Sequence, residues 1–157
     1  MTSKELRIEY TEYRSSGEMS VQDRELVCKA LQAMSNAYAP YSHYHVGAAV
    51  RLSDGSVVCG SNQENAAFPS GLCAERTAMF AASSQNPDKH ILSLAVAGGP
   101  DGKLDNAPCT PCGACRQVMA QYQAKSGLPM SVILVGADRI WKFCRVEDIL
   151  PFIFTGV

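Results

Sequence analysis

Apolar residues between Asp23 and Pro40 recur at helical spacing, which predicts a helix on this stretch. One face of that helix carries Leu26, Val27, Ala30, Leu31 and Met34. Ser20 and Asp23 stand three residues apart just before it, in the spacing of an N-terminal capping box. Pro40 ends the helix, because the residue before a proline avoids helical backbone angles.

Short apolar runs elsewhere predict strands. They lie at 46–50, 56–60, 91–97, 130–135 and 141–144. The dipeptide Asp54-Gly55 separates the first two runs and predicts a hairpin turn. Further helices are expected at about 73–82, 112–122 and 146–150. Residues 1–20 are polar and could form either a strand or a loosely attached arm.

The order of these elements predicts an α/β fold. Strands and helices alternate along residues 1–157, and neither a linker nor an internal repeat divides them. We therefore expect a single domain with three α/β/α layers and a mixed central sheet of about five strands.

Composition and charge exclude several function classes. The formal net charge is −1, and no basic run marks the cationic footprint that a nucleic acid partner requires. No apolar run is long enough to span a bilayer, and no signal peptide is visible, so we expect a cytoplasmic protein without a membrane partner. Seven cysteines in such a protein favour metal binding or buried packing over disulfides.

Two cysteine motifs carry the candidate chemistry. Cys73 is expected to open one helix, and Cys112 and Cys115 to share one face of another, with Pro111 in its first turn. Helix N-termini stabilise thiolates. Three thiolates around one Zn²⁺ leave a fourth position for water, which is the pattern of a catalytic zinc site.

Other interpretations of these cysteines remain open. A Cys-x-x-Cys pair can be a redox pair, and Cys109 could act as a fourth ligand in a closed structural site. Cys28, Cys59 and Cys144 lie in apolar periodic segments, where packing is their expected role.

Two charged neighbours of Cys73 could act in catalysis. Glu75 is close enough to move protons from a metal-bound water without ligating, although a solvated helix residue is the ordinary alternative. Arg76 could offset the negative charge of the thiolates, although it could equally be a surface arginine.

The cysteines, Glu75 and the Pro-Cys-x-x-Cys segment match the zinc deaminase signature, with Cys73 in place of the usual histidine. The sequence resembles the homotetrameric cytidine deaminases from about Arg24 to Phe154. Four segments carry the resemblance: Ala39-Pro40-Tyr41-Ser42-His43-Tyr44-His45-Val46-Gly47-Ala48-Ala49, Asn62-Gln63-Glu64-Asn65-Ala66-Ala67-Phe68, Cys73-Ala74-Glu75-Arg76-Thr77-Ala78 and Pro111-Cys112-Gly113-Ala114-Cys115-Arg116-Gln117.

The resemblance implies one zinc ion per subunit and the deamination of cytidine and 2'-deoxycytidine to the uridines. It also implies a homotetramer whose sites are completed by neighbouring subunits. In that family Asn62 and Glu64 would bind ribose hydroxyl groups, and Phe154 would reach a neighbour's site; simple packing is the alternative for Phe154. Tyr44 replaces a phenylalanine near the base, and its hydroxyl group then requires a partner if it is buried.

The backbone N–H of Ala74 and a carbonyl near Thr110 could hold the edge of the base, because both flank ligands. Three alternatives compete with cytidine deamination. They are a deaminase of a blasticidin-type nucleoside, a nucleic-acid-editing deaminase and a zinc-stabilised protein without activity.

Overall fold

The computed structural model describes residues 1–155, so the last two residues of the expected 1–157 domain lie outside it. Six strands form one sheet in the order β1-β6-β5-β4-β2-β3. β4 and β5 pair parallel and the other neighbours antiparallel, so the sheet is mixed. The strands are β1 (Thr11–Tyr13), β2 (Tyr44–Leu52), β3 (Val57–Ser61), β4 (Ile91–Pro100), β5 (Ser131–Val135) and β6 (Ile140–Phe143).

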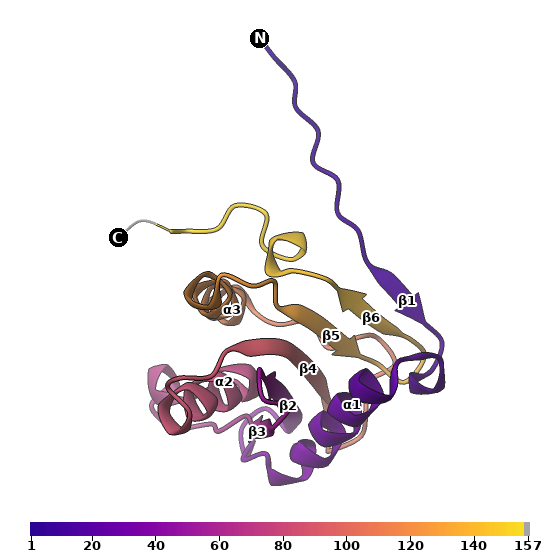
Figure 1. The fold of residues 1–157 in the computed structure, drawn as a ribbon. Coiled ribbons are helices and arrows are strands. Elements are labelled where there is room, and N and C mark those ends of the chain that lie inside the picture. Colours follow the sequence, from indigo (N-terminus) through magenta and orange to yellow (C-terminus); the bar gives the residue numbers. More distant parts are fainter. Residues whose placement is uncertain (156–157) are drawn as a thin grey trace.

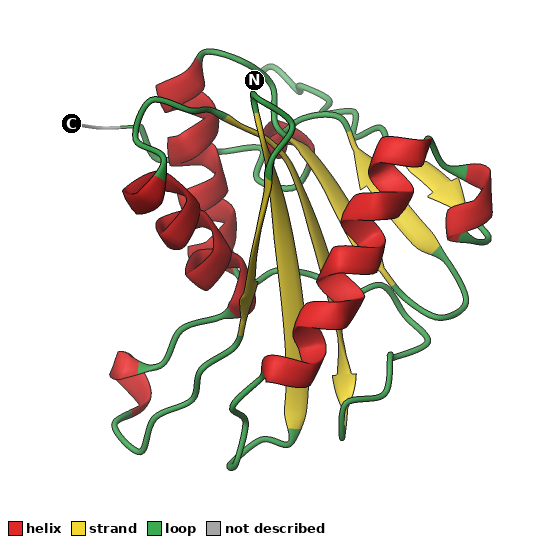
Figure 2. Cartoon of the chain, turned by 60° about the horizontal axis from the view of Figure 1, so that its bottom comes forward, coloured by secondary structure: helices red, strands yellow, loops and turns green. Residues whose placement is uncertain are grey.

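Helices cover both faces of this sheet. α1 (Val21–Ala33) lies on one face, and α2 (Ala74–Gln85) and α3 (Gly113–Ser126) lie on the other (Figure 1). Figure 2 shows the strands between the two helical layers. The expected three-layer α/β/α architecture is therefore confirmed. No helix within residues 1–155 has both the length and the hydropathy to cross a membrane.

Alternating side chains give the sheet two apolar faces. In β4, Leu94 and Val96 pack into the core below α2 and α3, whereas Ala95 and Ala97 pack into the core below α1. A strand that is buried on both faces has an unbroken apolar sequence rather than a polar alternation. The apolar run at 91–97 follows from this position in the middle of the sheet.

The predicted local signals are confirmed. The Ser20 hydroxyl group accepts a hydrogen bond from the backbone N–H of Asp23 at 3.1 Å, which caps α1. The turn between β2 and β3 places Gly55 at φ 87°, a left-handed conformation that glycine adopts without steric cost.

Three elements differ from the sequence-based expectation. The sheet has a sixth strand, β1, because Thr11–Tyr13 pairs with β6; three residues are too few to show a period of two. The expected helix at 146–150 is only a single 3₁₀ turn, Val146–Asp148. α1 ends at Ala33 and tightens into a second 3₁₀ turn, Met34–Asn36, before Pro40 is reached.

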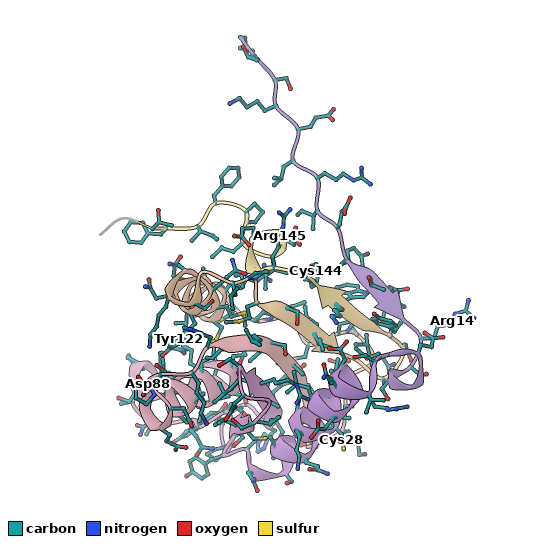
Figure 3. The ribbon with its side chains drawn as sticks, in the orientation of Figure 1. Arg14, Cys28, Asp88, Tyr122, Cys144 and Arg145 are labelled. Atoms are coloured by element: carbon teal, nitrogen blue, oxygen red, sulfur yellow. The ribbon has the colours of Figure 1, made fainter. Side chains whose placement is uncertain are left out.

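The expectation that Cys28, Cys59 and Cys144 pack in the core is wrong, because all three are exposed. Figure 3 shows Cys28 on α1 and Cys144 just after β6. Cysteine is common in buried positions, but its place on a helix or strand face is set by the neighbouring layers and not by the local apolar pattern.

A glycine lets α2 approach the sheet closely. A Cβ atom at Gly60 in β3 would lie 2.8 Å from the backbone oxygen of Ala74 and still closer to the backbone N of Ala78. Both obstacles are backbone atoms of α2, so they can yield only if the whole helix shifts. Gly60 therefore fixes how far the N-terminus of α2 stands from the sheet.

We expect Gly60→Ala to lower the free energy of unfolding by at least about 2 kcal/mol, because the added methyl group must displace α2. Chemical denaturation would measure this loss. Gly17→Ala is the matched control, because its Cβ atom would meet only the Ser15 hydroxyl oxygen at an ordinary 3.4 Å. Equal stability of the two variants would contradict the close approach.

Candidate metal centre

Two helix N-termini bring three cysteines together. Cys73 is the N-cap residue of α2, Cys112 is the N-cap residue of α3, and Cys115 lies in the first turn of α3. Their Sγ atoms all lie within 4.8 Å of one another, and those of Cys112 and Cys115 are 3.5 Å apart. Neither N-cap sulfur makes a capping hydrogen bond to the backbone of its helix. Pro111 precedes the N-cap instead of lying in the first turn as expected.

The three sulfurs fit a zinc ion. Tetrahedral zinc bonded to sulfur at about 2.3 Å places its ligand atoms about 3.8 Å apart. The 3.5 Å between the sulfurs of Cys112 and Cys115 lies close to that value, and the other two separations do not exceed 4.8 Å. Cys109 is not a member of this group among residues 1–155. The group therefore has three protein ligands, as in a catalytic and not a structural zinc site.

The protonation of the cysteines also favours a cation. A hydrogen bond with Cys115 and the guanidinium of Arg76 lower the pKa of Cys73 to about 5, although burial opposes the shift. The same hydrogen bond to Cys73, burial and the nearby Glu75 carboxylate raise the pKa of Cys115. Ionisation of Cys73 thus makes ionisation of the neighbouring Cys115 less favourable. A divalent cation removes this conflict, because it attracts every thiolate.

Glu75 is buried next to the sulfurs, with only 4% of its surface exposed. Burial raises the pKa of its carboxyl group, and the negative charge on Cys73 adds to the shift. Glu75 lies in the first turn of α2, and the neighbouring Cys115 thiol partly offsets this rise in pKa. Glu75 is therefore not a solvated helix residue, which was the alternative interpretation of its position.

Arg76 is half-buried, and its guanidinium contacts one of the expected metal ligands. Its Nη2 donates to the Sγ of Cys73 at 3.6 Å. Its Nε is buried and has no hydrogen-bond partner among the described residues. Three thiolates around one Zn²⁺ carry a net charge of about −1. The positive guanidinium of Arg76 stabilises this negative charge.

The segment with Asn62 and Glu64 joins β3 to the N-terminus of α2. The side chain of Asn62 donates to the backbone oxygen of Tyr44 and accepts from the backbone N–H of Val46, both at 2.8 Å. Between them, Gln63 and Leu72 exchange two backbone hydrogen bonds of 2.9 Å. This pairing places Gln63, the residue between Asn62 and Glu64, beside Leu72, the residue that precedes Cys73.

Glu64 also holds the chain before β2. Its Oε2 accepts from the backbone N–H groups of Tyr41 and Ser42 at 2.9 and 3.3 Å. Hydrogen bonds from Ser42 and Tyr41 lower its pKa, so the exposed carboxylate is ionised. A carboxylate has about four acceptor positions, and this anchoring leaves room for a ligand hydroxyl group.

Tyr44 is half-buried, and its hydroxyl group finds polar neighbours. Burial, together with the nearby Cys109 and Asp105, raises its pKa to about 12. Burial likewise raises the pKa of the Cys109 thiol to about 12, so this cysteine stays protonated. Cys109 therefore lies beside Tyr44 and is not one of the three sulfurs that could bind the metal.

The two remaining expected site residues, Ala74 and Phe154, lie in different parts of the structure. Ala74 is fully buried at the first position of α2, directly between Cys73 and Glu75. Phe154 lies at the C-terminal end of the described chain, where Gln117 of α3 binds its backbone oxygen at 2.8 Å. The phenyl ring is 69% exposed, so this chain alone does not enclose it.

Sequence reasoning missed Arg116. Its Nε donates to the backbone oxygen of Pro111, and its Nη1 donates to that of Ile149, both at 2.9 Å. Arg116 thereby fixes the backbone just before Cys112. Its place directly after Cys115 was visible in the sequence, but neither carbonyl partner could be identified without the tertiary structure.

A family model described as the cytidine and deoxycytidylate deaminase zinc-binding region matches residues 20–129. The chain belongs to this family. A cytidine deaminase of Halalkalibacterium halodurans is 48% identical over 135 residues, which are 85% of this chain and 96% of that protein. The zinc-binding character of the family agrees with the group of three cysteines.

Solved structures show the same fold. The crystal structure of a cytidine deaminase from Burkholderia pseudomallei matches with a TM-score of 0.72 and 37% identity, over 87% of this chain and 100% of that one. A protein named blasticidin-S deaminase, from Bacillus cereus, is 27% identical over 139 residues, which are 87% of this chain and 95% of that protein.

We expect Cys115→Ser to lose most of its zinc and Cys109→Ser to keep about one equivalent per chain, since only Cys115 belongs to the sulfur group. Elemental analysis of the purified variants would measure this. Zinc loss from Cys109→Ser equal to that from Cys115→Ser would instead indicate a closed site with four ligands.

Proposed function

We propose that this protein hydrolyses cytidine and 2'-deoxycytidine to uridine and 2'-deoxyuridine with release of ammonia. The observation that carries the proposal is the buried carboxylate of Glu75 beside a group of three, and not four, cysteine sulfurs. When bound there, Zn²⁺ supplies the Lewis acidity that turns water into a nucleophile near neutral pH.

Glu75 moves the protons of the reaction. It takes a proton from the attacking water and delivers it to N3 of the cytosine ring, while the water oxygen bonds to C4. It then carries the second proton of this water to the amino group, the C4–N bond breaks, and ammonia leaves. Burial suits this relay, because a raised pKa lets the carboxyl group both accept and donate near neutral pH.

The surrounding residues hold the substrate. The backbone N–H of Ala74 is one of the N–H groups that helix α2 leaves unpaired at its start, and it binds the edge of the base. Asn62 and Glu64 bind the ribose hydroxyl groups, and Tyr44 lies beside the base. Arg76 offsets the charge of the ligand sulfurs and thereby preserves the acidity of the metal.

The protein acts on small nucleosides in the cytoplasm, as a homotetramer in which neighbouring subunits complete each site. The net charge of −1 disfavours a nucleic acid substrate. Large exposed apolar side chains support assembly: Phe152 is 90% and Phe154 is 69% exposed. Phe154 is the residue that would enter the site of a neighbour.

An ammonia-release screen over nucleosides tests the activity. We expect rapid release from cytidine and 2'-deoxycytidine, slow release from blasticidin S and loss of all activity after zinc chelation. Faster release from blasticidin S would favour the activity that the name of the Bacillus cereus relative describes. No release from any nucleoside by the zinc-loaded protein would refute deaminase activity.

We expect Glu75→Gln to retain zinc and to lower kcat for cytidine by about 10²- to 10⁴-fold, because the amide cannot carry a proton. Zinc content and steady-state kinetics would be measured together. Glu147→Gln is the control, since Glu147 is exposed and outside the site. Activity of Glu75→Gln within a few-fold of that of the control would reject the proton relay.

A further inference from the structure

The first residues of the chain form an extended arm with the pattern of a strand. Residues 1–10 are all exposed, and in Figure 1 they run away from the sheet beyond the end of β6. Leu6, Ile8 and Tyr10 alternate with the charged Arg7 and Glu9, whose side chains form an ion pair at 3.0 Å. Such alternation is typical of a strand with one apolar face.

The apolar face of this arm continues an aromatic cluster of the sheet. The ring of Tyr10 lies 5.4 Å from those of both Trp141 and Phe143. Because side chains two residues apart share a face, Leu6 and Ile8 extend that cluster past the end of β6. Figure 3 shows the part of the arm nearest the N-terminus standing clear of the rest of the chain.

The sequence of the arm is complementary to itself. An antiparallel pairing centred on Ile8 sets Arg7 opposite Glu9, Leu6 opposite Tyr10 and Lys4 opposite Glu12, with each pair formed twice. Opposite charges and apolar pairs that face each other across two strands stabilise the pairing. A pairing in which residue i faces residue j of the partner, and residue j faces residue i of the partner, is the hallmark of a two-fold interface.

We propose that two copies of this chain associate by antiparallel pairing of their arms about a two-fold axis at Ile8. The pairing runs along the edge of β1 that β6 leaves free and joins the two sheets through it. The isolated ribbon would be marginal, but β1 anchors each end to a sheet. The arm precedes residue 20, where the family match begins, so this contact is independent of the proposed function.

Disulfide trapping tests the register. Two Ile8 residues on the axis have Cα atoms about 4.5 to 5.5 Å apart, within the reach of a disulfide. Two Leu6 residues are separated by four strand positions, or about 13 Å. With mild oxidant, zinc-loaded Ile8→Cys should form covalent dimers at least about tenfold faster than Leu6→Cys, after subtraction of the wild-type background from the native exposed cysteines. Equal rates, or no dimer from Ile8→Cys, would overturn the proposal.

Charge variants of the Ile8→Cys protein test the pairing itself. Arg7→Glu places glutamates opposite each other, and Glu9→Arg does the same with arginines, so each alone should slow dimer formation roughly tenfold. Co-expressed, the two variants restore opposite charges at both positions, and mass spectrometry should show mixed dimers at about the original rate. Rates that do not change in the single variants, or mixed dimers no faster than the others, would overturn the proposed pairing.

Discussion

The crowding of three cysteine sulfurs at two helix starts is the constraint on which the structure of the site depends. Thiols this close cannot all ionise without a cation, because the lowered pKa of Cys73 is accompanied by a raised pKa of Cys115. A site of this kind requires α2 and α3 to begin at the same place. The sheet supplies that geometry, because both helices cover the same face of it.

The polar residues around the sulfurs serve structure and chemistry together. Asn62 ties the end of β3 to the start of β2, and Glu64 ties the chain before β2 to the same segment. Arg76 and Arg116 hold the two ligand-bearing segments, the first through a sulfur and the second through a carbonyl oxygen.

The family domain and the N-terminal arm follow different physical rules. Burial on both faces fixes the register of strands such as β4 in the domain, since a shift by one residue would exchange their two apolar faces. The arm has one apolar face, on which Tyr10 packs against Trp141 and Phe143 while Leu6 and Ile8 are exposed. Its register can be set only across an interface, where the charges of Arg7 and Glu9 decide the alignment.

The sequence by itself determined the layered fold and the candidate group of Cys73, Cys112 and Cys115, because strand and helix periods are local and Cys-x-x-Cys spacing is set by one helical turn. The tertiary structure decided what depends on distant neighbours. It excluded Cys109 from the sulfur group and placed it beside Tyr44, it exposed Cys28, and it revealed β1 as a sixth strand. Exposure and hydrogen-bond partners arise from the packing of layers, which no short window of sequence contains.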